Sequence, residues 1–116
     1  MDIEQIRDYC ISKAGTTEEF PFDKDTLVFK VMGKMFALCG LEHQPLFINL
    51  KCDPDRAVEL REQYDCIQPA YHMNKKHWNS VYIESGELSR NELLELIDHS
   101  YQLVVSKLPK KVKAEL

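Results

Sequence analysis

The sequence predicts an α+β fold in two layers, with a mostly antiparallel five-stranded sheet packed against helices. Three observations support this prediction. Apolar residues recur at helical spacing in three separate segments of the chain. Between those segments, apolar and polar residues alternate, as they do in strands with one buried face. The strands come in runs joined by short turns, which favours antiparallel pairing. The expected order is helix, three strands, helix, two strands, helix (α-β-β-β-α-β-β-α).

Length and composition favour one soluble domain over residues 1–116. The chain has 116 residues, of which 44% are hydrophobic and 29% charged, as in ordinary globular proteins. No apolar run reaches the roughly 20 residues of a membrane-spanning helix, and the first residues, MDIEQIRDYC, are charged and amphipathic rather than a basic segment followed by an apolar stretch. The four cysteines form no CxxC pair, which favours buried thiols in a reducing compartment. A cytoplasmic location with no membrane partner is therefore expected.

The first helix is predicted from Asp2, a helix-capping residue, to Gly15, which is suited to a helix end. The following segment, TTEEFPFDKD at 16–25, has the composition of a loop. Phe20 and Phe22 are expected to hold this loop against the core.

A β-hairpin is predicted over 26–39, where two alternating runs flank Gly33 and Lys34. A two-residue connection with glycine first is typical of a type II′ turn. A third strand is predicted to start at Pro45, since proline is tolerated at the beginning of a strand.

The second half of the chain adds a helix, a hairpin and a last helix. Asp53 and Pro54 are strong start signals for the middle helix. Two extended runs, IQPAYHM and WNSVYI, flank the expected hairpin tip NKKH at 74–77. Ser89 and Glu92 form a capping box for the last and longest helix, which should end before Pro109.

The distribution of charge is uneven. The net charge is −4, which argues against a strong general attraction to nucleic acid. Through Asp65 there are 8 basic and 13 acidic residues, whereas from Cys66 onward there are 7 and 6. The second part contains two basic clusters, NKKH at 74–77 and KLPKKVK at 107–113. Each cluster has two interpretations: it contacts a polyanion, or it is a charged surface that is simply solvated.

No motif predicts catalysis, a metal or a cofactor. The histidines and cysteines lack the paired spacings of a zinc site, and neighbouring carboxylates such as Glu18 and Glu19 lie in a polar loop. There is no glycine-rich phosphate loop. The sequence therefore predicts no catalytic residues, no metal and no cofactor.

The segment around NKKH is the main candidate for binding. Lys75 and Lys76 lie beside Tyr71, His77 and Trp78. Lysines can meet phosphates and aromatic rings can stack on bases or wedge between them. The alternative is structural: Trp78 anchors the hairpin to the sheet, and the lysines keep its tip soluble.

Five segments together resemble the MmcQ/YjbR family of small bacterial proteins, in order and over nearly the whole chain. They are EEFPF (18–22), LVFKVMGKMFAL (27–38), NLKCDPDRAVELRE (49–62), YHMNKKHWNSV (71–81) and SYQLVVSKLPKK (100–111). The resemblance implies the α-β-β-β-α-β-β-α order and a two-layer fold similar to that of type III secretion chaperones. It also implies a "double wing" of two hairpins, as in a phage transcription activator, and no catalytic residues.

The resemblance and the basic clusters predict a DNA-binding protein without enzymatic activity. Double-stranded DNA would be the partner, and its phosphates would contact the hairpin tips and the basic tail. The predicted contact residues are Lys34, Lys75, Lys76, Lys110 and Lys111. The alternative is a protein-interaction or chaperone-like module, or a homodimer, that uses an exposed sheet face and binds no nucleic acid.

Overall fold

The computed structural model describes residues 1–116, which form one sheet of six antiparallel strands in the spatial order β1-β2-β3-β4-β6-β5. Every neighbouring pair is antiparallel. The strands are β1 (Thr16–Glu19), β2 (Thr26–Val31), β3 (Lys34–Gly40), β4 (Phe47–Lys51), β5 (Ile67–Pro69) and β6 (Trp78–Tyr82).

The helices begin where the sequence predicts them. Asp2, Asp53 and Ser89 each accept a hydrogen bond from a backbone N–H in the first helical turn, which satisfies a donor that has no partner within the helix. The α-helices are α1 (Ile3–Ile11), α2 (Pro54–Gln63), α3 (Arg90–Ser106) and α4 (Lys110–Lys113), and a 3₁₀ turn, η1, covers Ile83–Ser85. The longest of them, α3, has 17 residues with charges along it, and none of the helices is suited to crossing a bilayer.

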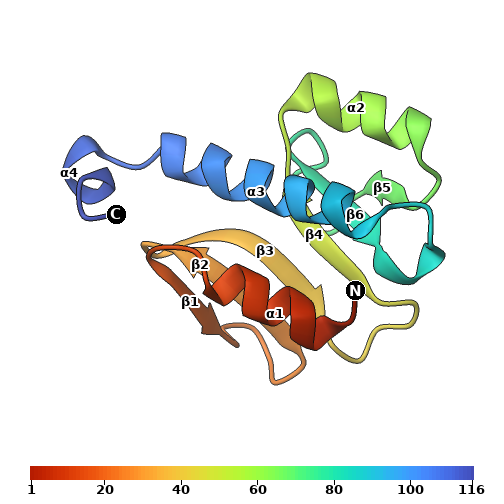
Figure 1. The fold of residues 1–116 in the computed structure, drawn as a ribbon, viewed down its shortest axis with the longest axis horizontal. Coiled ribbons are helices and arrows are strands. Elements are labelled where there is room, and N and C mark those ends of the chain that lie inside the picture. The colour runs from red at the N-terminus through yellow and green to blue at the C-terminus, as the bar shows by residue number, and fades with distance from the viewer.

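Helices α1, α2 and α3 all lie over the same face of the sheet (Figure 1). The long α3 runs across the middle and contacts β2, β3 and β4, whereas α1 contacts β1 and α2 contacts β5. A single hydrophobic core lies between these layers, with Phe29, Phe36 and Ile97 fully buried in it. The predicted two-layer α+β fold is confirmed, and the opposite face of the sheet has no helix on it.

The predicted strand count of five is wrong by one, because Thr16–Glu19 forms β1 rather than a loop. This edge strand is entirely polar, so it has no apolar alternation to reveal it. Glu18 points toward α1, where its carboxylate is paired with Arg7 at 2.5 Å. The short α4, after Pro109, was also absent from the predicted order.

The β2–β3 hairpin is confirmed, but its turn is one residue earlier than predicted. Val31 pairs with Lys34, so Met32 and Gly33 form the two-residue connection. Both have positive φ, 49° and 83°, which is the pattern of a type I′ turn rather than type II′. Lys34 is consequently the first residue of β3 and not part of the turn.

Phe20 and Phe22 do not hold their loop against the core, contrary to the prediction. Their side chains are 50% and 68% exposed. Because β1 already fixes one end of the segment to the sheet, the loop at 20–25 does not need an apolar anchor. Its aromatic side chains are therefore left on the surface.

All four cysteines are free and buried, as predicted. Burial raises the pKa of Cys10 to about 12 and that of Cys52 to about 11, and it also raises the pKa of Cys39 and Cys66. Thiols in this environment stay protonated at neutral pH and are poor nucleophiles.

Candidate nucleic-acid interface

The two hairpins predicted as wings have their tips at the same end of the sheet. The β2–β3 turn is at Met32 and Gly33, and the carboxyl end of β4 lies next to the start of β3 in the antiparallel register. On the other side of β4, Lys51 pairs with Trp78, the first residue of β6. The β5–β6 connection, residues 70–77, therefore emerges at that end as well.

Three lysines surround a hollow of about 260 Å³ at this end, which we call the lysine hollow. Lys34 comes from β3, Lys51 from β4 and Lys107 from the residue that caps α3. Lys34 and Lys107 are exposed, and Lys51 is half-buried. The remaining walls are apolar: Met35, Trp78, Val104 and Leu108.

A buried hydroxyl ties together the elements that carry these lysines. Ser100 of α3 is fully buried, and its Oγ donates a hydrogen bond to the carbonyl of Phe36 at 2.5 Å. The same Oγ accepts a bond from the backbone N–H of Lys51 at 2.9 Å. The register of β3 shifts at Phe36, as in a β-bulge, which leaves a backbone carbonyl available to the helix.

The second tip is an eight-residue loop rather than a tight NKKH turn, because β5 ends at Pro69 and not at Met73 as predicted. Asn74 organises the loop: its carbonyl accepts bonds from the N–H groups of His77 and Trp78, and its side chain accepts one from Lys76. Such local side-chain bonds favour turns over strand pairing.

An arginine from α2 holds this loop in place. The guanidinium of Arg61 donates to the Oδ1 of Asn79 at 2.6 Å and to the carbonyls of Lys75 and Trp78. The Lys75 ammonium lies 4.8 Å from the centre of the Tyr71 ring, within cation–π distance. Lys75 and Lys76 are both exposed.

The carboxyl terminus brings further lysines to the same end. A side chain added at Gly15 would meet Leu116 at 2.5 Å and Met32 at 3.0 Å, so the last residue lies against the β2–β3 turn. Lys110 and Lys111 are exposed in α4, between the end of α3 and this contact (Figure 1).

We call this region the basic end. Eight lysines belong to it, and none of them takes part in any of the four ion pairs of the structure. They are Lys34, Lys51, Lys75, Lys76, Lys107, Lys110, Lys111 and Lys113. Acidic residues here include Asp53, which caps α2, and Glu115. Lys34, Lys51 and Lys107 share the lysine hollow. The other five lie in the 70–77 loop that leads to Trp78 and in α4, which follows Leu108, and Trp78 and Leu108 both line that hollow.

Of the five lysines predicted from sequence, only Lys34 lines the lysine hollow; the other four lie in the 70–77 loop and in α4. Lys51, Lys107 and Arg61 were not among the predicted contact residues. Lys51 precedes a helix cap and has no basic neighbour in sequence, so only its pairing with Trp78 places it in the lysine hollow. Trp78 is half-buried on the sheet, in agreement with its predicted anchoring role.

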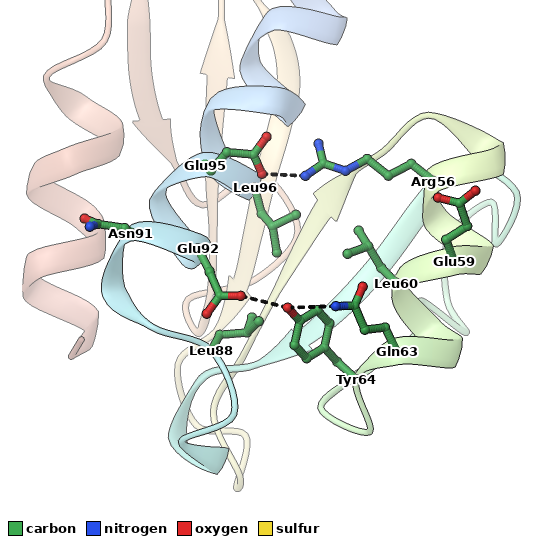
Figure 2. Close-up of a pocket in the computed structure, with 10 residues that line it drawn as sticks. All are labelled: Arg56, Glu59, Leu60, Gln63, Tyr64, Leu88, Asn91, Glu92, Glu95 and Leu96. Carbon is green, nitrogen blue, oxygen red and sulfur yellow. Dashed lines mark hydrogen bonds and ion pairs between the residues drawn. The ribbon is translucent and has the colours of Figure 1, made fainter.

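A second hollow, of about 410 Å³, lies between α2 and α3 (Figure 2). Its polar groups already bind one another: Arg56 pairs with Glu95 at 2.5 Å, and Tyr64 donates to Glu92 at 2.7 Å. Glu59 adds a third carboxylate. The Ser89 N–H and the Tyr64 hydroxyl both lower the pKa of Glu92. This groove is acidic, so it does not suit a phosphate.

The fold and the basic end define a small α+β protein with an antiparallel sheet covered on one face and two hairpin tips at one end. The YjbR family model matches residues 11–103, and the chain belongs to this family. It is 34% identical to "Uncharacterized protein YjbR" of Escherichia coli K12, over 96% of this chain and 93% of that one. It is 45% identical to "Uncharacterized protein YbdF" of Escherichia coli O157:H7, over 79% and 75%.

Solved structures show the same fold. A Deinococcus radiodurans protein, DR2400, of the family-model domain DUF419, superposes with a TM-score of 0.90 at 40% identity, over 97% of this chain and 86% of that one. A Pseudomonas syringae protein gives a TM-score of 0.74 at 34% identity, over 89% and 98%.

Proposed function

We propose that this protein binds double-stranded DNA through phosphate contacts at the basic end and catalyses no reaction. The observation that supports the proposal is the convergence of both hairpin tips, α4 and the lysine hollow at one end, with eight lysines outside any ion pair. Lysines without a carboxylate partner can exchange their counterions for phosphates at little cost. The protonated, buried thiols support the absence of cysteine chemistry.

The acidic remainder of the molecule predicts weak binding that depends on salt. Repulsion from the α2–α3 groove orients the duplex toward the basic end, and it also lowers the affinity. The dissociation constant should fall in the nonspecific range, roughly 10⁻⁴ to 10⁻⁶ M at physiological salt.

The test is fluorescence anisotropy of a labelled duplex with charge-reversal variants. Lys34→Glu and Lys75→Glu with Lys76→Glu should weaken binding and reduce the salt slope by about 1 for each phosphate that the variant no longer neutralises. Lys24→Glu is the matched control, because Lys24 is exposed and outside any ion pair but lies in the loop at the opposite end of the sheet.

Two results would contradict the proposal. The first is the absence of any binding at low salt. The second is an equal loss of affinity in Lys24→Glu and Lys34→Glu, since that would report net charge rather than a site.

A second candidate function is self-association through the open face of the sheet. The observation that favours it is the exposure of Phe20 and Phe22 beside a face that no helix covers. An apolar dimer should persist when salt is raised, and Phe22→Asp should dissociate it. Light scattering at low and high salt measures both effects, and a monomer under all conditions would exclude this function.

A further inference from the structure

The open face of the sheet holds a hollow of about 570 Å³, which we call the open-face hollow. Ile48 and Leu50 of β4 are buried in the core, so Phe47 and Asn49 point to the opposite face. Volumes of this size are typical of small-molecule sites. Its main walls come from the sheet and from the loops at 20–25 and 70–77: Phe22, Leu38, Phe47, Asn49, Met73 and Trp78.

Half of the twelve residues that line the hollow are hydrophobic, and Asn49 is the one buried polar residue among the others. Asn49 and Ser80 are 6% and 8% exposed and face each other across β4 and β6. The Ser80 hydroxyl donates to the Oδ1 of Asn49 at 2.5 Å. The Nδ2 of Asn49 has only the Met73 sulfur as acceptor, at 3.3 Å. Because a thioether is a weak acceptor, this buried amide has donor capacity left for a ligand.

The walls suit a flat ring. Trp78 and Phe47 line the hollow, and the His43 ring stands edge-on to Phe47 with 4.6 Å between ring centres. Phe22 is exposed at the rim and can close over a bound ring. A planar ligand that carries a carbonyl or a ring nitrogen would stack on these side chains and accept a bond from Asn49.

The open-face hollow adjoins the lysine hollow. Met35 and Trp78 line both of them, so a single ligand can place a ring on one side of Trp78 and an anionic group on the other. A nucleotide has this composition, with a planar base and a phosphate joined by a sugar. In a duplex the bases are paired and stacked, so only an unpaired base could enter.

We propose that the open-face hollow takes an unpaired base of a nucleic-acid strand whose phosphate lies at the lysine hollow. For the phosphate contact, the inference rests on the proposed function. The base stacks between the sheet aromatics and Phe22, and Asn49 donates to its carbonyl or ring nitrogen. The protein then prefers unpaired regions, although a duplex carries more phosphates for the same length.

Trp78 is the only tryptophan of the chain, so tryptophan fluorescence reports directly on the open-face hollow and the adjoining lysine hollow. Three probes of equal length separate the contributions: an oligothymidine strand, the same strand with abasic sites, and the matched duplex. The oligothymidine should bind most tightly and change the Trp78 emission. Phe22→Ala should weaken its binding roughly 5- to 100-fold, the range for removal of one stacked aromatic ring.

Phe20→Ala is the matched control, because Phe20 is exposed in the same loop but does not line the hollow. It should leave the affinity unchanged. Both phenylalanines are exposed, so both variants should fold.

The outcomes distinguish the two proposals. Equal binding of the oligothymidine and its abasic counterpart, with Lys34→Glu still harmful, would overturn the base site and leave the proposed function intact. Equal affinities of Phe22→Ala and Phe20→Ala would also overturn the base site. Absence of binding by every probe at low salt would overturn both proposals.

Discussion

The basic end and the α2–α3 groove are the two strongly charged regions of the molecule, and they differ in what their charges contact. In the groove, Arg56 is held by Glu95 and Tyr64 by Glu92, and of the three carboxylates only Glu59 has no partner (Figure 2). At the basic end, Lys34 and Lys107 have no carboxylate partner. A surface whose charges pair internally stabilises the fold, whereas unpaired charges of one sign are available to a partner.

The two regions also differ in how they are built. The basic end depends on Ser100, a fully buried hydroxyl that joins α3 to β3 and β4. The groove is closed by side chains that remain partly in solvent. Removing the buried Ser100 hydroxyl is costly, because its removal leaves buried backbone groups without hydrogen-bond partners.

The largest effect on stability is therefore expected from Ser100→Ala. The substitution leaves the Phe36 carbonyl and the Lys51 N–H without their hydrogen-bond partner. It should therefore lower the free energy of unfolding by about 1–3 kcal/mol. Urea denaturation measures the change. Ser106→Ala is the control, because Ser106 is exposed and bonds only a carbonyl of its own helix. Equal midpoints for the two variants would contradict the role assigned to Ser100.

The same contrast separates what the sequence could predict from what it could not. The starts of the helices at Asp2, Asp53 and Ser89 were predictable, because a cap acts within one helical turn. The lysine hollow was not predictable, since it joins Lys51 and Lys107 through strand register and the packing of α3. The turn was predicted one residue too late, at Gly33 and Lys34 instead of Met32 and Gly33. Methionine rarely adopts positive φ, so the sequence did not indicate that Met32 belongs to the turn.

The candidate site was predicted in part, for the same reason. Lys75, Lys76, Lys110 and Lys111 stand in basic clusters that are visible in the sequence. Asn49, by contrast, is an ordinary polar residue in a strand pattern. The proposed role of Asn49 as a hydrogen-bond donor depends on its contacts with Ser80 and Met73, which form only in the folded protein.

A smaller effect is expected from His99, which lies between the two regions. The backbone N–H of Asp53 donates to its Nε2 at 3.2 Å, so the neutral ring is the form that fits. Burial lowers the pKa of His99, and Arg56 lowers it further, against the opposing charges of Glu95 and Asp53. Because the folded pKa is below the unfolded value, the unfolded chain binds the proton more tightly.

The free energy of unfolding should consequently decrease as the pH is lowered. The penalty is absent above the ordinary histidine pKa of about 6.5, grows as the pH decreases from there, and is complete below the folded pKa. Urea midpoints at pH values of roughly 7.5 and 5.5 measure it, on either side of that ordinary value. His99→Gln should lose part of the pH dependence, whereas His72→Gln, at an exposed loop position, should keep it. Equal pH dependence in the two variants would count against this role of His99.

The smallest effect is expected from the ion pair that closes the groove. Arg56 and Glu95 keep 32% and 56% of their side-chain surfaces exposed, so solvent screens their attraction. A double-mutant cycle with Arg56→Ala and Glu95→Ala should give a coupling energy of about 0.2–1 kcal/mol that decreases with salt. DNA affinity should rise slightly in Glu95→Ala, because the removed charge belongs to the acidic groove that repels the duplex. A coupling energy above roughly 2 kcal/mol would mean that the pair is effectively buried and that the groove, like the basic end, depends on a contact shielded from water.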